Sequence, residues 1–416
     1  MVRTGRTWNP AVLCGGLILA AGGWSTTPAQ ACTTAVASGV VTVDGRPVLW
    51  KNRDAEDKRN QVIHDATGRY AFVGVVNGGD MAALEVWAGL NAAGFAIMNS
   101  ASYNLEELES IAEGSFMRLA LQSCATIADF QALLERTDAG GRDVTANFGV
   151  VDAQGGAAIF ETGRHQFKRF DADDSANAPR GLLVRTNFSD TGNADGGSGM
   201  LRRQRAHLLL DELVAARRLD VATLLARVAR DVANPFIGSD PMSQAAPRYA
   251  YTADSVCRFD TASAAVFVGV KPGEDPLLAT AWVVVGQPVT GVAVPIWVRA
   301  GSVPPELAAA ATASTMTAAL DEVRARFYPQ TRGEMKKYID AAALRDPVSS
   351  PLPRLAAAEK CNLERAAVAL RSWATKAPTS AEVAALQEEI ARDTVAAVRA
   401  SLAPGAPQPA ETPTRR

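Results

Sequence analysis

A cysteine, Cys32, stands at the start of a predicted β-hairpin, and this placement limits how the chain can fold. Residues 33–42 are mostly small or β-branched and predict a strand. An Asp-Gly pair then gives a turn signal, and residues 47–53 predict a returning strand that ends at Asp54. A hairpin of this kind brings the end of its second strand back to its start. We therefore expect Cys32 and Asp54 to lie close together.

The segment before Cys32 has the layout of a secretory signal. Two arginines are followed by an apolar run over residues 11–23, which is too short to span a bilayer stably, and then by the tripeptide Ala-Gln-Ala. Cleavage after this tripeptide would make Cys32 the first residue of the mature chain. The sequence thus predicts a signal peptide over residues 1–31 and export to the periplasm or the medium.

The composition excludes several functional classes. The chain has 416 residues and a formal net charge of −2, with 48% hydrophobic and 21% charged residues, which is typical of a soluble globular protein. No basic surplus favours nucleic-acid binding, and no stretch after the signal is long and apolar enough to span a membrane. The cysteines are too scattered for a metal site or a disulfide framework, so no metal or cofactor is expected.

Three further cysteines of the mature chain, Cys124, Cys257 and Cys361, lie in apolar surroundings. We expect them to be buried thiols, because free cysteine is among the most buried residue types. A single disulfide among them stays open as an alternative, since an exported protein meets oxidising conditions.

Strand and helix signals come in blocks, which predicts a layered α+β domain rather than regular βαβ repeats. Beyond the hairpin, strands are predicted at 70–76, 84–89, 94–99, 147–151, 157–161, 165–170, 181–188, 264–270 and 281–285. Helices are predicted at 116–134, 200–216 and 221–232. The two late strands look like part of a second sheet.

The chain changes character after residue 303. Residues 304–403 are rich in Ala, Leu, Glu and Arg, carry no strand signal, and predict a helical portion. This portion could pack against the sheets or against a partner subunit, in the second case in a homo-oligomer. Residues 404–416 are Pro-rich and polar and predict a disordered tail. The expected organisation is a signal peptide, a domain over 32–303, the helical portion and the tail.

Cys32 would supply both a nucleophile and a base once it became the first residue. A thiol is a strong nucleophile, and an α-amine with a pKa near 7.7–8.0 can accept its proton at about neutral pH. No histidine is then needed, and none of the three in the chain has local support for pairing with Cys32. A surface lipoprotein or binding protein with an acylated Cys32 is the alternative of a different class.

Four segments carry a resemblance to a known family. They are Cys32-Thr-Thr, Asp44-Gly-Arg-Pro-Val-Leu-Trp-Lys-Asn-Arg-Asp54, Glu85-Val-Trp-Ala-Gly-Leu-Asn-Ala-Ala-Gly-Phe-Ala-Ile-Met-Asn99 and Asn147-Phe-Gly-Val-Val-Asp-Ala-Gln-Gly155. Over residues 32–300 the chain resembles the N-terminal-nucleophile hydrolases, and within them the isopenicillin N acyltransferase-like autoproteolytic family. That family is related to choloylglycine hydrolases, penicillin V acylase and acid ceramidase. The resemblance implies a four-layer αββα sandwich that cleaves or transfers the acyl group of amides, here with a helical C-terminal extension.

The resemblance also assigns roles to particular residues. Cys32 matches the nucleophile, and Asp54 matches the carboxylate that binds the amine and thiol of the nucleophile. Asn187 matches the amide of an oxyanion hole, whose N–H would donate to the oxygen of the tetrahedral intermediate. Arg202 matches an arginine that follows a Gly- and Ser-rich loop and supports the site electrostatically, with the adjacent Arg203 as the alternative.

Lys51 departs from the family pattern, which often has an arginine or glutamine at this position. We expect Arg53 to point to the opposite face of the strand from Lys51, and a role for Lys51 in orienting the nucleophile stays open. Trp87, Asn91 and Asn99 are candidates for an acyl pocket, although core packing and turn formation account for them as well.

The sequence therefore predicts an exported amidohydrolase or acyltransferase that acts on a linear, non-peptide amide of a small molecule through an acyl-enzyme on Cys32. A dipeptidase with the same nucleophile is a further alternative, because residues 51–54 also resemble the secernin-like dipeptidases. The acyl chain and the leaving amine are left undetermined.

Overall fold

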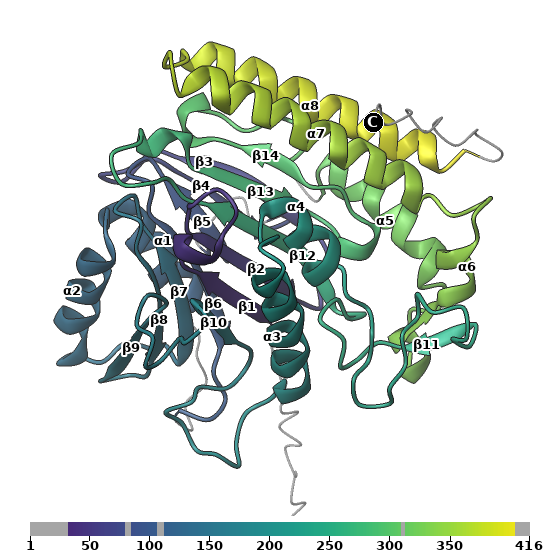
Figure 1. The fold of residues 1–416 in the computed structure, drawn as a ribbon, viewed down its shortest axis with the longest axis horizontal. Coiled ribbons are helices and arrows are strands. Elements are labelled where there is room, and N and C mark those ends of the chain that lie inside the picture. Colours follow the sequence, from purple (N-terminus) through teal and green to yellow (C-terminus); the bar gives the residue numbers. More distant parts are fainter. Residues whose placement is uncertain (1–31, 80–84, 106–111, 309–312, 404–416) are drawn as a thin grey trace, which may run out of the picture.

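Two antiparallel sheets lie face to face, with helices on their outer faces (Figure 1). The computed structural model describes residues 32–79, 85–105, 112–308 and 313–403. The predictions of a signal peptide over residues 1–31 and of a disordered tail over 404–416 lie outside these residues.

The first sheet is built around the predicted hairpin. Its order is β10 (Leu182–Arg185), β1 (Thr33–Ala37), β2 (Val48–Asp54), β12 (Thr261–Val268), β13 (Thr280–Val284) and β14 (Val294–Ile296). β1 and β2 pair antiparallel with Thr33 opposite Asn52, which confirms the hairpin. The late strands β12 and β13 were expected in a second sheet, but they belong to the first sheet. β12 pairs with β2, and β13 pairs with β12.

The second sheet is a meander of seven strands. They are β3 (Asn60–Asp65), β4 (Phe72–Asn77), β5 (Ala88–Asn91), β6 (Ala96–Ala101), β7 (Ala146–Val151), β8 (Ala157–Thr162) and β9 (Phe167–Asp171), and each pairs with the next along the chain. A small third sheet joins β11 (Tyr249–Tyr251) to β15 (Tyr338–Asp340). The expectation of no strand after residue 303 was therefore wrong, because β15 gains its hydrogen bonds from a distant partner.

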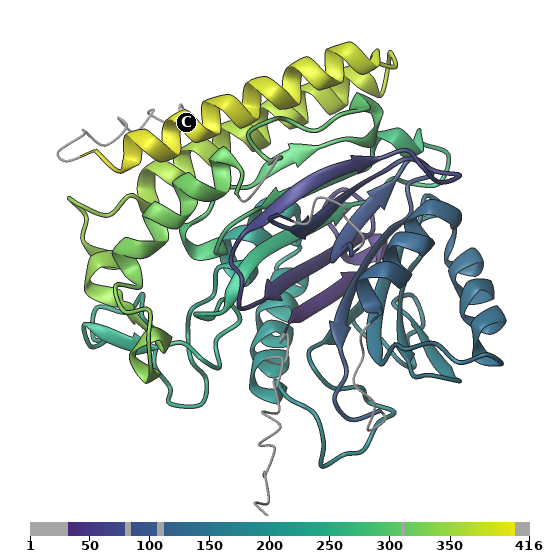
Figure 2. The same cartoon turned by 180° about the vertical axis from the view of Figure 1, so that it is seen from behind.

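Three hydrophobic cores separate four layers. Along the hairpin, Val36 and Leu49 belong to the core between the two sheets, whereas Ala35 and Trp50 belong to the core beneath the helices of the first sheet. Successive side chains of a strand point to opposite faces, so one hairpin serves both cores. The third core packs the outer face of the seven-stranded sheet against two helices and contains several phenylalanines, among them Phe130. The predicted αββα sandwich is confirmed, and Figure 2 shows it from behind.

The helix predicted at residues 116–134 is in fact two helices, α1 (Glu113–Ser123) and α2 (Ile127–Asp138). The break comes at Thr126, which forms a capping box with Asp129 and so begins α2. Asn91 closes α1 from the neighbouring strand, since its Nδ2 donates to the carbonyls of Leu121 and Cys124. Asn91 thus serves the packing of α1.

The helices over the first sheet follow the predicted pattern more closely. The predicted helix at 200–216 is α3 (Met200–Ala215), and the next is a short α4 (Val221–Thr223) that continues as a π-helical turn (Leu224–Ala229).

The C-terminal helices are α5 (Thr315–Phe327), α6 (Ala341–Arg345), α7 (Leu352–Trp373) and α8 (Ser380–Ser401). α7 and α8 form a long hairpin beside β14 (Figure 1). A homo-oligomer stays a prediction.

The cysteines differ from expectation at one position. Cys124 and Cys257 are buried as predicted, but Cys361 is exposed, because its position on α7 faces solvent beside the exposed Lys360. All four cysteines of the described residues are free, so they form no disulfide.

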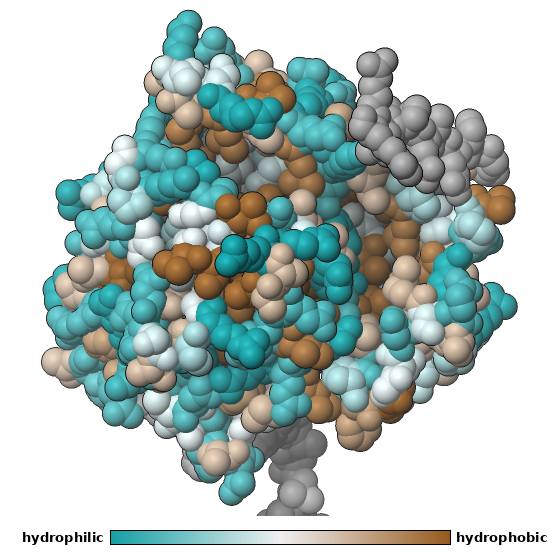
Figure 3. Space-filling view, viewed as in Figure 1, coloured by the Kyte–Doolittle hydropathy of each residue, from teal (hydrophilic) through white to brown (hydrophobic). Residues whose placement is uncertain are grey.

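The helices of the described ranges include none that is long and apolar enough to cross a membrane. On the face drawn in Figure 3, hydrophilic side chains predominate and hydrophobic ones gather in separate groups among them.

Candidate active site

Cys32 lies directly before β1 and is held through its backbone on both sides. Its nitrogen donates to Oδ1 of Asn187 over 2.9 Å, and its carbonyl oxygen accepts from Nη1 of Arg202 over 2.8 Å. The residue is buried, with 2% of its surface exposed. The alternation of side chains along β1 points the Cys32 thiol to the face that carries Val36, towards the seven-stranded sheet.

Asn187 reaches Cys32 because β10, which ends two residues before it, pairs with β1. Its Oδ1 accepts from both the Cys32 nitrogen and Nη2 of Arg202, at 2.9 and 3.0 Å, and its Nδ2 donates to the carbonyl of Ala101. Two donors facing one oxygen fix the orientation of the carboxamide. Asn187 therefore holds the nitrogen of Cys32 with its oxygen, whereas the sequence assigned its N–H to an oxyanion; the oxyanion role stays a prediction.

Arg202 enters the site from the first turn of α3. Besides the contacts above, its Nη1 donates to Oγ1 of Thr33 over 3.0 Å. The neighbouring Arg203 instead forms two hydrogen bonds to Asp190, away from Cys32. Gly199 precedes the helix with φ of 89°, and a Cβ there would meet the guanidinium of Arg202, so glycine is required for this approach. Of the two arginines, Arg202 is the one that contacts Cys32, and its supporting role stays a prediction.

Asp54, at the end of β2, lies between two guanidinium groups. Its Oδ1 accepts from Oγ1 of Thr261 over 2.6 Å, and its Oδ2 lies 3.3 Å from Nε of Arg258 and 3.9 Å from Nη1 of Arg202. Oδ2 is buried without a hydrogen-bond partner among the described residues. Burial raises the pKa of Asp54, while the two arginines oppose that rise. Asp54 Oδ2 is therefore paired with cationic groups but accepts no hydrogen bond from the described residues.

Arg258 is the residue that the sequence did not reveal. It lies in the segment just before β12, and its Nη2 also donates to Asp260 over 2.9 Å. In the sequence it stands between Cys257 and Phe259 with no recognisable spacing to Cys32. Only the pairing of β12 with β2 brings it to Asp54.

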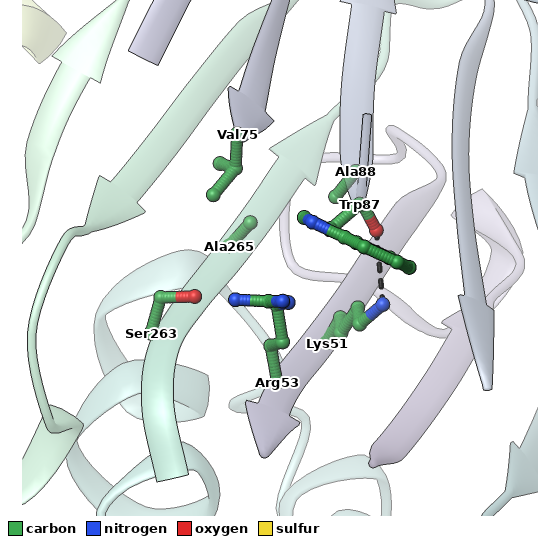
Figure 4. A pocket seen from close by; sticks show the side chains of 7 residues that line it. All are labelled: Lys51, Arg53, Val75, Trp87, Ala88, Ser263 and Ala265. Carbon is green, nitrogen blue, oxygen red and sulfur yellow. Dashed lines mark hydrogen bonds between the residues drawn. The ribbon is translucent and has the colours of Figure 1, made fainter. Parts of the chain in front are cut away.

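Lys51 and Arg53 lie on the same face of β2, towards the seven-stranded sheet (Figure 4). Nζ of Lys51 donates to the carbonyl of Trp87 over 2.9 Å and to Oδ1 of Asn99 over 2.6 Å. The expectation that they would point to opposite faces was wrong, because residues two apart in a strand share a face. Burial lowers the pKa of Lys51 to about 8 and that of Arg53 to about 10.

An αββα sandwich with a cysteine at the head of a central strand is the arrangement implied by the resemblance to N-terminal-nucleophile hydrolases. Residues 41–206 match the model of the family described as acyl-coenzyme A:6-aminopenicillanic acid acyl-transferase. This match confirms the family resemblance that the sequence segments predicted. A search of curated protein sequences gave no match.

Solved structures of similar proteins cover a little over half of this chain. They include an N-acylethanolamine-hydrolyzing acid amidase ortholog from Caenorhabditis elegans, with 17% identity, a TM-score of 0.39, and coverage of 57% of this chain and 92% of that one. A variant of conjugated bile acid hydrolase from Clostridium perfringens has 12% identity, a TM-score of 0.37, and coverage of 61% and 89%. Penicillin V acylase from Agrobacterium tumefaciens has 13% identity, a TM-score of 0.37, and coverage of 64% and 86%.

Proposed function

We propose that the protein is exported, loses residues 1–31, and then acts as an amide hydrolase or acyltransferase with Cys32 as its N-terminal nucleophile. The observation that carries this proposal is the setting of the Cys32 nitrogen. That nitrogen is held by Asn187, and the buried carboxylate of Asp54 offers an oxygen that has no hydrogen-bond partner among the described residues.

The chemistry depends on the nitrogen becoming an amine. In the uncleaved chain it is a peptide N–H, which has a single hydrogen, donated to Asn187. A peptide nitrogen is not basic, whereas an α-amine has a pKa near 7.7–8.0 and can take the thiol proton. Cleavage also leaves the nitrogen with further hydrogens, for which Asp54 Oδ2 is a suitable acceptor.

The proposed reaction has two stages. The amine takes the proton from Sγ of Cys32, and the thiolate attacks the amide carbonyl to form a tetrahedral intermediate. The protonated amine then gives its proton to the leaving nitrogen, which departs and leaves a thioester on Cys32. Water, or a second amine in an acyl transfer, takes the acyl group and restores the thiol. The negative charge of Asp54 stabilises the ammonium form between these steps.

The substrate that the observations favour is a non-peptide N-acyl compound. The matched family is described by acyl transfer to 6-aminopenicillanic acid, in which an acyl group forms an amide with an amine. An N-terminal cysteine with this site can run such a reaction in either direction, depending on whether water or an amine accepts the acyl group.

Intact mass and N-terminal sequencing of the exported protein test the proposal. We expect a mature chain that begins with unmodified Cys32 and hydrolyses members of a panel of N-acyl amides. Cys32→Ala should abolish this activity without unfolding the protein, and Cys32→Ser should retain more than Cys32→Ala. A diacylated Cys32, or full activity in Cys32→Ala, would reject the mechanism.

A matched comparison isolates the role of the amine. A chain that carries additional residues before Cys32 and cannot be cleaved should be folded but inactive, whereas the same chain beginning at Cys32 should be active. Equal activity of the two forms would show that the free amine is not the base.

A further inference from the structure

A small cavity lies between the two sheets beside the active site. It is lined by Lys51 and Arg53 of β2, Ser263 and Ala265 of β12, and Val75, Trp87 and Ala88 of the facing sheet, and we call it the β2 cavity. Figure 4 shows the two cationic side chains rising from β2 towards the indole of Trp87. The space amounts to ≈ 10 Å³, about the room needed for one water-sized oxygen atom.

Uncharged groups accept the hydrogen bonds of the two cations that line the β2 cavity. Nη1 and Nη2 of Arg53 donate to the side-chain oxygens of Asn60 and Asn77, each over 2.8 Å. The acceptors of Lys51 are a backbone carbonyl and the amide of Asn99. Every one of these acceptors is uncharged, so the hydrogen bonds leave both positive charges in place. Nearby carboxylates also act on the two cations electrostatically, Asp57 and Glu85 on Arg53 and Glu113 on Lys51.

One donor of the pair lacks a hydrogen-bond partner in the part of the chain that the structure describes. Nε of Arg53 is buried and makes no hydrogen bond within the described ranges, while the guanidinium lies 4.7 Å from the centre of the Trp87 ring. Burying a charged donor without an acceptor is costly unless something pairs with it. Lys51 is connected to Glu113 through Asn99, whose Nδ2 donates to Glu113 over 2.6 Å.

The β2 cavity is within reach of the nucleophile. Thr34 pairs with Lys51 and Thr33 with Asn52, so Cys32 continues β1 opposite Arg53. Neighbouring strands are about 4.8 Å apart, which puts the cavity about 5–10 Å from the Cys32 side chain, the length of about three or four carbon atoms. The Cys32 thiol shares the inter-sheet face with both cations.

We propose that the β2 cavity receives one oxygen of a carboxylate carried by the amide substrate, so that the enzyme prefers an amide with an acidic group a few carbons from the scissile bond. The proposal rests on the proposed function, since it names the substrate class of the same site. Lys51 and Arg53 are then residues that determine specificity, and charge-assisted hydrogen bonds from both provide the preference.

The two cations could instead serve the thiolate of Cys32. In that case their loss would slow acidic and neutral substrates equally, because every substrate meets the same thiolate. A role in substrate recognition would lower kcat/KM for the acidic substrate alone. The comparison of matched acidic and neutral amides therefore separates the two roles.

The kinetic test uses N-glutaryl-propylamine against its ω-carboxamide, and N-pentanoyl-β-alanine against N-pentanoyl-β-alaninamide, with release of the amine as the readout. The first pair places the carboxylate on the acyl side and the second places it on the amine side. We expect one pair to show a preference for the acid of about tenfold to a hundredfold. Lys51→Met and Arg53→Gln should each remove it, whereas Lys360→Met, on the exposed face of α7, should keep it. Equal rates within both pairs, or equal losses for acid and neutral amide, would overturn the proposal.

A binding test remains informative if no amide is cleaved. Cys32→Ala protein beginning at residue 32 is titrated with glutarate by calorimetry, alone and with Arg53→Gln or Lys51→Met, and thermal unfolding confirms that each variant is folded. Glutarate binding that is lost in both variants supports the β2 cavity even where the proposed reaction fails. Absence of binding to the parent protein, together with cleavage of neutral amides, would reject the cavity while leaving the proposed function intact.

Discussion

Asn187 Oδ1 accepts a hydrogen bond from the backbone nitrogen of Cys32 across 155 positions of sequence, at 2.9 Å. The same oxygen accepts from Arg202, whose other nitrogen binds the Cys32 carbonyl. The main chain of Cys32 is thus fixed at its nitrogen and at its carbonyl by two residues that flank one loop. Under the proposed function, this arrangement positions the nitrogen that cleavage would turn into an amine.

Removing the Asn187 carboxamide should harm both catalysis and stability. We expect Asn187→Ala to lower kcat/KM by about a hundredfold or more, because the amine loses its anchor, and to lower the free energy of unfolding by about 1–3 kcal/mol, because buried donors lose their acceptor. Asn187→Asp keeps an oxygen at the same place and should retain more activity than Asn187→Ala. Urea unfolding and steady-state kinetics measure the two effects, and an Asn187→Ala protein with unchanged kcat/KM would contradict this role.

The neighbouring arginines offer a matched pair. Arg202→Gln should lower the free energy of unfolding by about 3–5 kcal/mol or abolish activity, because it breaks a buried charged network with Asp54. Arg203→Gln removes a partly exposed contact with Asp190 and should cost about 0–1 kcal/mol with activity kept. Thermal unfolding and kcat/KM of the two variants test the assignment, and the reverse order of effects would mean that the site uses Arg203.

Gly199 can be tested against a glycine of nearly equal backbone geometry. Gly199→Ala should lower kcat/KM, because its new methyl group would displace the Arg202 guanidinium. Gly273 has φ of 87°, and a Cβ there meets nothing within 4 Å, so Gly273→Ala reports the backbone strain alone, about 1 kcal/mol. The difference between the two variants measures the contact with Arg202. Identical unfolding and kinetics for the two would show that Gly199 is needed only for its φ.

Arg258 should affect the pH at which kcat/KM falls on the acid side of the pH profile. Arg258 opposes the rise that burial causes in the pKa of Asp54, so Arg258→Gln should raise that pKa further. The ionised carboxylate is the form that stabilises the ammonium, so the acid limb of kcat/KM should move to higher pH. Arg258→Lys keeps the charge and should shift the limb less. A pH profile for Arg258→Gln that overlays that of the unaltered protein would reject this role for Arg258.

The acidic-substrate preference should weaken above pH 8. Burial lowers the pKa of Lys51 to about 8, so Lys51 is positively charged below this pH and loses its charge as the pH rises through it. The charged or titratable groups that act on Lys51 are Arg53 on the same strand, Cys32 directly before β1, Asp54, and Glu113, which is hydrogen-bonded to Asn99. Arg53 keeps its charge to about pH 10, so a loss of preference near pH 8 reports the deprotonation of Lys51. The ratio of kcat/KM for the matched acid and neutral amides is measured from pH 6 to 9.5.

A control variant separates Lys51 from the other groups that titrate in this range. Lys51→Arg should move the loss of preference to higher pH, because an arginine stays charged across it. A ratio that falls at the same pH in both proteins would show that Lys51 is not the group responsible.

The sequence predicted the parts of the site that lie on one local element. Cys32 and Asp54 follow from a hairpin with an Asp-Gly turn, and the structure pairs β1 with β2 as expected. Arg258 could not be found in this way, because it reaches Asp54 only through a strand pairing about 200 residues away in sequence. The split between α1 and α2 was missed because the apolar spacing continues through the capping residue Thr126. β15 was missed because three residues give too short a signal.

The hairpin of α7 and α8 lies beside β14, the last strand of its sheet, and provides side chains to the backbone there. Glu359 of α7 accepts from the nitrogen of Ala293, and Gln387 of α8 accepts from the nitrogen of Trp297. An edge strand left with free backbone groups is a template on which other chains can add. The C-terminal helices therefore cover this edge of the sheet, and we expect a chain cut before α7 to aggregate through β14 even with its active site intact.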